Sequence, residues 1–423
     1  MSTLRLRERT PETIQPASAR PVTDEAHARA AEIVAAVRER GDEAVLEYAR
    51  QFNELRDNLH RFSPEECHAA RERITPKTRS VLDRCAGRVG AFASAQRGAL
   101  TETAIAIPGG SAGHRIIPVR RAGCYVPGGR YPLVSSLLMS VVTARAAGVA
   151  EVWVATPRPT DDMLAAAAIA GASGVIGVGG AHGIAALAFG FSGVGPCDCI
   201  VGPGNSYVTA AKFLVSSQVR IDMLAGPSEL LVIADDSASP VLVAADLLAQ
   251  AEHDSEAVPI LVSTSRDLVE AVQSEIEQQT AALSSATTIA EALGNGFFSI
   301  VSSLEEAARI SNSVAPEHLQ LSIAKADEIV PLLENYGGLF IGEGSAEVIG
   351  DYCAGPNHVL PTGGTGRFRC GLSVFDFLKV ATWLRVDNSS EATELYDDAV
   401  SLAEVEGLPG HRQAAWRRLG GDS

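Results

Sequence analysis

Glu317 and His318 are neighbours in the segment VAPEHLQLSI (residues 314–323), directly after a proline. Proline disfavours helix at the residue before it, so Pro316 predicts that the preceding helical run ends here. The following HLQLSI alternates apolar and polar residues, which indicates a strand. Because successive side chains of a strand point to opposite faces, the pair can share one site only if the chain is still irregular at Glu317. Together the two groups could transfer protons near neutral pH, although a solvated glutamate beside a structural histidine is the simpler alternative.

Side chains that could bind a metal ion are spread widely along the chain. The nine histidines form no HxxxH or HExxH motif. Candidates lie in three segments: Gln250 and His253 in LLAQAEHD, Asp351 and His358 in IGDYCAGPNHVLPTGG, and Glu406 and His411 in EVEGLPGH. Gln250 and His253 would share one helix face, and the mixed nitrogen and oxygen donors of these segments would suit Zn²⁺ or a similar ion. Structural roles stay open, because the candidates are distant from one another in sequence.

Two glycine-rich turns, GVGGAHG (residues 177–183) and GPGN (residues 202–205), each lie between a predicted strand and a predicted helix. Backbone amides at such a position can approach a pyrophosphate closely. Neither turn is a strict GxGxxG, so close packing of strand on helix explains them equally well.

The pattern of apolar residues predicts how these groups are positioned. Residues 24–97 have a helical pattern, in which Ser63 and Glu66 have the spacing of a capping box. From about residue 121 strands and helices alternate up to a Gly-Pro break at Gly226, and a second alternating series follows. Such alternation indicates parallel, doubly wound sheets. Two units of this kind suggest a substrate cleft between domains, and the tail after LSVFDFLKVATWL is predicted to be mostly helical.

Composition restricts the class of protein. The 423 residues suffice for two or three domains, and 46% apolar with 20% charged residues is typical of soluble globular proteins. A net charge of −16 argues against a nucleic-acid surface. We expect no signal peptide and no membrane span, because the N-terminal segment lacks an apolar core and longer apolar stretches are interrupted. Seven cysteines without a CxxC pair, Cys197 and Cys199 in a predicted strand among them, fit reduced thiols of a cytoplasmic protein.

Eight motifs along the chain carry a family resemblance. In order they are RRAGCYVPGG, IVGPGNSYVTAAK, DMLAGPSELLVIAD, ADLLAQAEHD, APEHLQL, GDYCAGPNHVLPTGG, GLSVFDFLK and EVEGLPGH. Together they resemble the histidinol dehydrogenase family, over a stretch from about residue 25 to His411. Eight motifs in a fixed order are far more specific than any one of them, so the structural alternatives given above lose weight.

The resemblance implies an α/β fold of two incomplete Rossmann-like, doubly wound domains with small helical N- and C-terminal segments. It implies the following division: an N-terminal arm (1–20), a metal-binding catalytic domain (21–123 and 230–372), an NAD-binding domain (124–229) and a C-terminal helical segment (373–423). The last segment would contribute to the partner's site in a homodimer. The implied reaction oxidises L-histidinol to L-histidine through L-histidinal, using two NAD⁺ and one Zn²⁺ per subunit.

The matching motifs also imply a role for single residues. Glu317 and His318 match the acid/base pair, with His318 as base for the alcohol and Glu317 drawing a proton from the hydrating water. The metal ligands are matched by Gln250, His253, Asp351 and His411, the last of which acts across the dimer interface. Substrate contacts are matched by Ser228, His358 and Glu406, together with Gln250, His253, His318, Asp351 and His411. Cofactor contacts are matched by Tyr125, His182 and Asn205.

Three positions depart from the family's pattern. His182 replaces a usual glutamine, Cys199 a common lysine, and Pro356 a small polar residue. An imidazole can still donate or accept a hydrogen bond, so cofactor binding would be altered or weakened. Two other functions stay open: a paralogue that oxidises another small alcohol such as a sulfonated diol, for which Arg130 is a candidate contact, and a catalytically silent, metal-stabilised dimer with a binding role.

Overall fold

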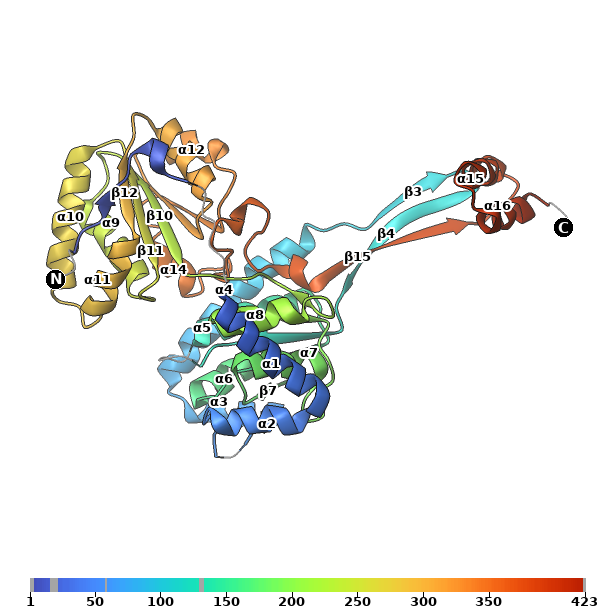
Figure 1. The fold of residues 1–423 in the computed structure, drawn as a ribbon, viewed down its shortest axis with the longest axis horizontal. Helices are drawn as coiled ribbons and strands as arrows, with labels where there is room; N and C mark the ends of the chain where they lie inside the picture. Colours follow the sequence, from blue (N-terminus) through green and yellow to red (C-terminus); the bar gives the residue numbers. More distant parts are fainter. Residues whose placement is uncertain (1–3, 16–21, 58, 129–132, 421–423) are drawn as a thin grey trace.

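The computed structural model describes residues 4–15, 22–57, 59–128 and 133–420, and Arg130 therefore lies outside the described residues. It has two α/β lobes and a long arm that projects from them (Figure 1). Two separate six-stranded sheets form the lobes, and a three-stranded sheet forms the arm. The predicted fold class of two doubly wound α/β units is confirmed.

The first lobe is built on a sheet with strand order β2-β7-β6-β5-β8-β9, parallel except for β2. Its strands are β2 (Arg61–Phe62), β5 (Arg121–Tyr125), β6 (Glu151–Ala155), β7 (Gly174–Ile176), β8 (Cys199–Val201) and β9 (Arg220–Ile221), and its crossover helices are α5 (Val134–Ala146), α6 (Asp161–Ala170), α7 (Gly180–Phe189) and α8 (Ser206–Val215). Alternate residues of β6 enter different apolar clusters, Val152 and Val154 on one face, Trp153 and Ala155 on the other. Burial of both faces explains why these strands have unbroken apolar sequences.

The N-terminal helices cover this same sheet, which corrects one predicted grouping. They are α1 (Asp24–Arg40), α2 (Asp42–Gln51), α3 (Pro64–Arg73) and α4 (Pro76–Gly98). The first two pack on α7, α1 also on α8, while α3 packs on α6 and α4 on α5. The division implied above groups residues 21–123 with residues 230–372. An amphipathic pattern shows that a helix has a buried face, but it does not show which sheet that face covers. The capping box of Ser63 and Glu66 is confirmed at the start of α3.

The second lobe has the all-parallel strand order β1-β12-β11-β10-β13-β14. Its strands are β1 (Arg7–Glu8), β10 (Glu229–Ala234), β11 (Val258–Ser263), β12 (Phe297–Ile300), β13 (His318–Ser322) and β14 (Gly338–Ile341). Its helices are α9 (Pro240–Ala251), α10 (Arg266–Thr280), α11 (Ala286–Asn295), α12 (Leu304–Val314), α13 (Ala326–Ile329) and α14 (Glu347–Asp351). The predicted N-terminal arm thus contributes the edge strand β1 to this sheet.

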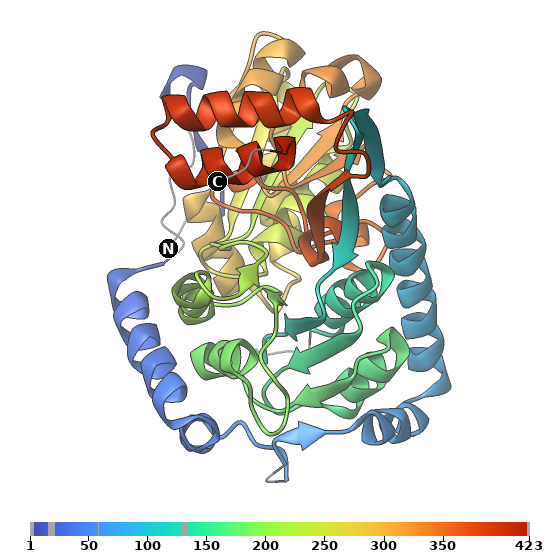
Figure 2. The same ribbon diagram turned by 90° about the vertical axis from the view of Figure 1, so that its right-hand side faces the viewer.

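The projecting arm corrects the expectation that residues 373–423 form a helical segment. Its antiparallel sheet consists of β3 (Thr103–Ile107), β4 (Gly110–Pro118) and β15 (Leu378–Val386), and α15 (Thr393–Val405) and α16 (Pro409–Trp416) lie at its far end (Figures 1 and 2). The nine residues of β15 pair with β4 along their whole length. The alternating sequence LKVATWLRV has the period of a strand. The helical segment expected at residues 373–423 is therefore wrong for these nine residues, whereas the mostly helical tail expected after Leu384 is confirmed by α15 and α16.

Several smaller predictions can be compared with the structure. All seven cysteines are free, and Cys199 lies in β8 while Cys197 lies in the loop before it.

The described residues also contain short 3-10 helices: η1 (Pro11–Thr13), η2 (Val330–Leu332), η3 (Thr365–Arg367), η4 (Val374–Phe377) and η5 (Arg417–Leu419). None of the helices in the described residues combines the length and the apolar character needed to cross a bilayer.

Candidate active site

The Glu317–His318 pair lies at a junction between helix and strand, as predicted. Helix α12 ends at Val314, Ala315 adopts a left-handed conformation with φ of 52°, and β13 begins at His318. Glu317 thus precedes the regular strand. Its carboxylate accepts a hydrogen bond from the Glu229 amide at 3.0 Å, and the Nδ1 of His318 lies 3.0 Å from the Glu229 carbonyl. The two side chains therefore share one site, 3.7 Å apart, beside the backbone of a single residue.

The environment of His318 determines its tautomer and its charge. A carbonyl oxygen only accepts hydrogen bonds, so Nδ1 carries the proton in the neutral ring. Nε2 is then an unprotonated acceptor, buried and without a hydrogen-bond partner among the described residues. Burial lowers the pKa of His318 to about 4, although the nearby Asp351 carboxylate acts in the opposite direction. The ring is therefore neutral near pH 7, and its free Nε2 can act as a base.

Three buried carboxyl groups lie near one another at this site, and besides burial itself the charges of Glu229 and Glu347 both act on the pKa of Glu317. Burial raises the pKa of Glu317 well above its ordinary value, and it raises the pKa of Glu229 to about 7 and that of Glu347 to about 8. Carboxyls with a pKa of about 7 or 8, as for Glu229 and Glu347, can exchange protons near neutral pH. Glu229 and Glu347 were not among the predicted site residues. Glu229 belongs to the GPSE break, and Glu347 stands four residues before Asp351, a spacing that places both on one helix face.

A cluster of metal-binding groups lies next to the acid/base pair. One ligand atom each of His253, Glu347 and Asp351 fits within 4.8 Å, and His253 Nε2 lies 3.5 Å from the Asp351 carboxylate. Asp351 also lies 3.9 Å from Nε2 of His318. Gln250, at the end of α9, is fully buried, and neither its amide nitrogen nor its amide oxygen has a hydrogen-bond partner among the described residues. An unpaired buried amide is costly without a ligand, so these residues fit a divalent metal ion bound by nitrogen and oxygen donors.

This centre lies at the amino ends of the strands of the second lobe. His318 and Glu229 each begin a strand, and α9 runs back so that Gln250 and His253 reach the same edge. In doubly wound sheets ligands usually bind at the carboxyl ends. The position is therefore unusual, and strand order alone would not have predicted it.

His358 and Ser228 lie at the edge of the centre. His358 Nδ1 lies 2.8 Å from the Asp351 carbonyl and its Nε2 lies 3.0 Å from the hydroxyl of Ser136 on α5. Both ring nitrogens are thus engaged, and His358 connects Asp351, the last residue of α14, to a helix of the first lobe. Ser228 directly precedes Glu229, whose backbone bonds to both Glu317 and His318.

The structure does not bring the remaining predicted residues into this centre. Glu406 and His411 are exposed and lie at the far end of the arm (Figure 1). Within one chain the metal cluster therefore contains three of the four predicted ligand residues at most. Whether His411 acts across a dimer interface stays a prediction.

The predicted cofactor residues meet in the first lobe. A cavity of about 410 Å³ is lined by Arg29, Ile33, Phe52, Glu54, Gly180, Ala181, His182, Asn205 and Tyr207. Asn205 caps α8 through bonds of 3.1 Å from the amides of Tyr207 and Val208, and the buried Tyr125 accepts a bond of 3.1 Å from the Gly180 amide. Unlike the metal centre, this cavity lies at the carboxyl ends of β5, β7 and β8. Its position and its aromatic lining suit a nucleotide.

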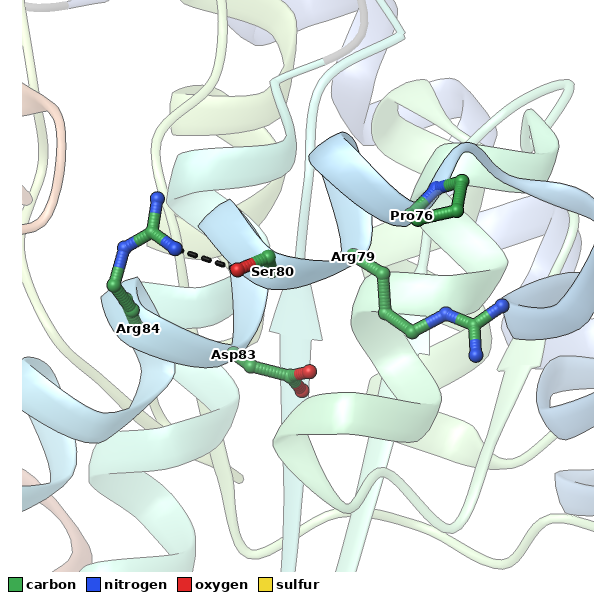
Figure 3. A pocket seen from close by; sticks show the side chains of 5 residues that line it. All are labelled: Pro76, Arg79, Ser80, Asp83 and Arg84. Carbon is green, nitrogen blue, oxygen red and sulfur yellow. Dashed lines mark hydrogen bonds between the residues drawn. The ribbon is translucent and has the colours of Figure 1, made fainter.

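A second hollow, of about 430 Å³, lies along α4 and is shown in Figure 3. It is lined by Pro76, Arg79, Ser80, Asp83 and Arg84, and the Arg84 guanidinium donates to the Ser80 hydroxyl at 2.6 Å. No predicted site residue lines it, and it is open to solvent along one helix face. It has no part in the chemistry proposed below.

Fold and site together define a two-lobed α/β enzyme with a buried acid/base centre and a separate nucleotide-type cavity. The family model described as Histidinol dehydrogenase matches residues 18–419. The chain belongs to the histidinol dehydrogenase family, and it is an oxidoreductase.

Individual relatives agree with this family. The histidinol dehydrogenase of Thermus thermophilus is 44% identical over 384 residues, which cover 90% of this chain and 92% of the relative. That of Geobacter sulfurreducens is 42% identical and covers 92% of both chains. The crystal structure of histidinol dehydrogenase from Elizabethkingia anophelis superposes with a TM-score of 0.91 at 30% identity, over 98% of each chain.

Proposed function

We propose that this chain oxidises L-histidinol to L-histidine through L-histidinal, with NAD⁺ as oxidant and one Zn²⁺ per subunit. The observation that carries the proposal is the neutral Nε2 of His318, which has no hydrogen-bond partner in the described part of the chain and lies 3.9 Å from a carboxylate of the metal-binding cluster, beside Glu317. When bound, Zn²⁺ would hold and orient the substrate and NAD⁺ would accept the hydride of each oxidation. The rest of the chemistry belongs to side chains of this chain.

His318 is the proposed base for the alcohol. Its Nδ1–H is held by the Glu229 carbonyl, which fixes the ring and leaves Nε2 to take the hydroxyl proton. The substrate's hydroxyl oxygen must lose its proton to a base while the carbon that carries it loses a hydride to NAD⁺. The second oxidation needs a hydrated aldehyde, and Glu317 is positioned to draw the proton from the attacking water. The 3.7 Å contact lets the two groups serve consecutive steps in one site.

Gln250, His253 and Asp351 are the proposed metal ligands of one subunit, and Glu347 lies within the same cluster. His411 is the proposed fourth ligand and Glu406 a substrate contact, both supplied by a second copy of this chain. Support comes from the arm, whose apolar side chains are exposed: Val380, Leu384, Leu402 and Val405 are 63–84% exposed. Such a surface on a projecting arm suits burial against another subunit.

The two sites assign a different function to each lobe. We assign cofactor binding to the first lobe, around His182 and Asn205, where the Tyr125 hydroxyl accepts a hydrogen bond from the Gly180 amide. Metal binding and acid/base chemistry belong to the second lobe. A cytoplasmic location without nucleic-acid or membrane partners is part of the same proposal, and the net charge of −16 argues against a nucleic-acid surface.

Two measurements test this function directly. Purified protein should contain zinc in proportion to its subunits and should reduce NAD⁺ with L-histidinol and with L-histidinal as separate substrates. Turnover of a sulfonated diol with none of histidinol would identify another alcohol dehydrogenase on this scaffold. Zinc content without NAD⁺ reduction by any alcohol would identify a metal-stabilised binding protein.

A further inference from the structure

Glu54 follows α2, and its carboxylate lies at the N-terminus of α7. The Oε2 of Glu54 accepts a hydrogen bond of 2.8 Å from the Gly179 amide and lies 2.8 Å from Nε2 of His182. Glu54 lines the cavity, and its side chain is 12% exposed. The other carboxylate oxygen, Oε1, accepts no hydrogen bond from a described residue. The carboxylate thus offers a free acceptor and a negative charge to whatever fills the cavity.

His182 fixes this carboxylate and presents a second polar atom. Its ring lies 5.9 Å from that of Tyr48 and 5.7 Å from that of Phe52, stacked on the latter, and only 1% of the residue is exposed. Because Nε2 faces Glu54, Nδ1 is left buried without a hydrogen-bond partner among the described residues. A buried imidazole nitrogen without a partner in the wall of a cavity indicates a ligand that completes it.

The charges around the cavity are unfavourable to an additional phosphate. Arg29 is the cation among the described lining residues, and it is already paired with Glu32 at 2.7 Å. The Gly179 amide is occupied by Glu54 and the Gly180 amide by the Tyr125 hydroxyl. These two donors at the N-terminus of α7 are therefore not free for an anion, and a phosphate here would meet a carboxylate instead.

We propose that Glu54, held in place by His182, selects a dinucleotide with an unmodified ribose diol, NAD⁺, over its 2′-phosphorylated form, NADP⁺. A carboxylate accepts hydrogen bonds from the 2′- and 3′-hydroxyls of a ribose. It repels the negatively charged phosphate that NADP⁺ has at the 2′ position. Glu54 acts as the specificity residue and His182 as its positioning residue. The inference rests on the proposed binding of NAD⁺ in the first lobe.

The test compares the two cofactors with zinc-loaded protein. Glu54→Gln keeps an oxygen for the Gly179 amide and removes the charge, so the NAD⁺/NADP⁺ ratio of kcat/KM should fall by about tenfold or more. Glu54→Asp keeps the charge and should keep most of the selectivity while KM rises. His182→Gln should raise the KM for NAD⁺ a few-fold and lower selectivity less than Glu54→Gln does. Glu43→Gln, which removes a 78% exposed carboxylate of α2, is the matched control and should change nothing.

Direct calorimetric titration with NAD⁺ and NADP⁺ separates this inference from the proposed function. Equal loss of selectivity in Glu54→Gln and Glu43→Gln, or unchanged selectivity in Glu54→Gln, would overturn the role of Glu54. The parent could fail to oxidise histidinol and still bind NAD⁺ more tightly than NADP⁺, with the preference lost in Glu54→Gln. That result would contradict the proposed reaction and support the role of Glu54 in cofactor selection. If Glu54→Gln unfolds, Glu54→Asp decides: a loss of selectivity despite the retained charge contradicts the proposal.

Discussion

The Nδ1 of His318 lies 3.0 Å from the backbone carbonyl of Glu229, the residue whose amide donates to Glu317. One residue at the start of β10 therefore orients both members of the acid/base pair at the start of β13. A backbone partner cannot be removed by substitution, so the functions of the two side chains have to be separated by changing the side chains themselves.

His318→Ala should slow both oxidation steps. Loss of one positioned acid/base group costs about two to four powers of ten in kcat. The measurement is NADH production from L-histidinol and, separately, from L-histidinal. A control is His68→Ala, because His68 is exposed on α3, a helix of the first lobe that lies outside both proposed sites. Parent-like rates in His318→Ala with either substrate would contradict the assignment.

Glu317→Gln should separate the two steps. The amide preserves the shape and can still accept a bond from the Glu229 amide, but it cannot take a proton from water. Oxidation of L-histidinol to the aldehyde should survive in part, whereas oxidation of L-histidinal falls sharply. An enzyme that oxidises histidinal as fast as the parent does would exclude Glu317 as the water-activating base. Equal losses in both steps would show that Glu317 instead holds His318 in place.

Glu347→Gln should weaken metal binding. Glu347 is buried, one carboxylate oxygen has no hydrogen-bond partner among the described residues, and the group lies with His253 and Asp351. Loss of a carboxyl group beside metal ligands typically lowers affinity about 10- to 100-fold. Competition with a chromophoric chelator measures the zinc affinity without any activity assay. Glu328→Gln, an exposed carboxylate, provides the control, and equal affinities of the two variants would remove Glu347 from the metal site.

Local patterns predicted the parts of the site that depend on local structure. Pro316 placed the end of α12, and the alternation after it placed β13, so the position of Glu317 and His318 at a junction followed from the sequence. The expectation that Gln250 and His253 share one helix face holds only for the placement of Gln250, because α9 ends at Ala251 and His253 lies in the turn that follows. Each of these features depends on residues a few positions apart, and that is the range over which periodicity carries information.

Contacts between distant segments were not predictable in this way. Glu54 and His182 are 128 positions apart, and nothing near either residue indicates the other. The strand β15 pairs with β4, more than 250 residues earlier in the chain. Its period-two pattern is short and directly precedes a helical segment, so the pattern alone assigns it to that segment. The helices α1 to α4 have clear buried faces, but only tertiary packing decides which sheet those faces cover.

The stability of the metal-free protein should depend on pH through Glu229. Burial raises the pKa of its carboxyl from 4.5 to about 7, so between these values the folded chain holds a proton that the unfolded chain has released. This stabilisation is complete below about pH 4.5 and is lost as the pH rises through 7, with a magnitude of about 3 kcal/mol. Glu229→Gln cannot ionise, so its Tm relative to the parent should rise between pH 5 and pH 8. A constant Tm difference across this range would contradict the raised pKa.

The arm should supply His411 to a neighbouring subunit. His253→Ala and His411→Ala should each lose zinc and activity, because each lacks one ligand in both sites of its homodimer. In a heterodimer of the two variants, one site draws an intact His253 from one chain and an intact His411 from the other, while the second site lacks both. Mixing the inactive variants under subunit exchange should therefore restore up to about a quarter of the parent activity, the statistical share of intact sites when half of the dimers are heterodimers.

Labelled subunits that exchange fully without any recovery of activity would show that His411 does not act across an interface. A mixture of His253→Ala with Gln250→Ala is the control and should stay inactive, because both substitutions lie in the same lobe and leave every site with a defective ligand set.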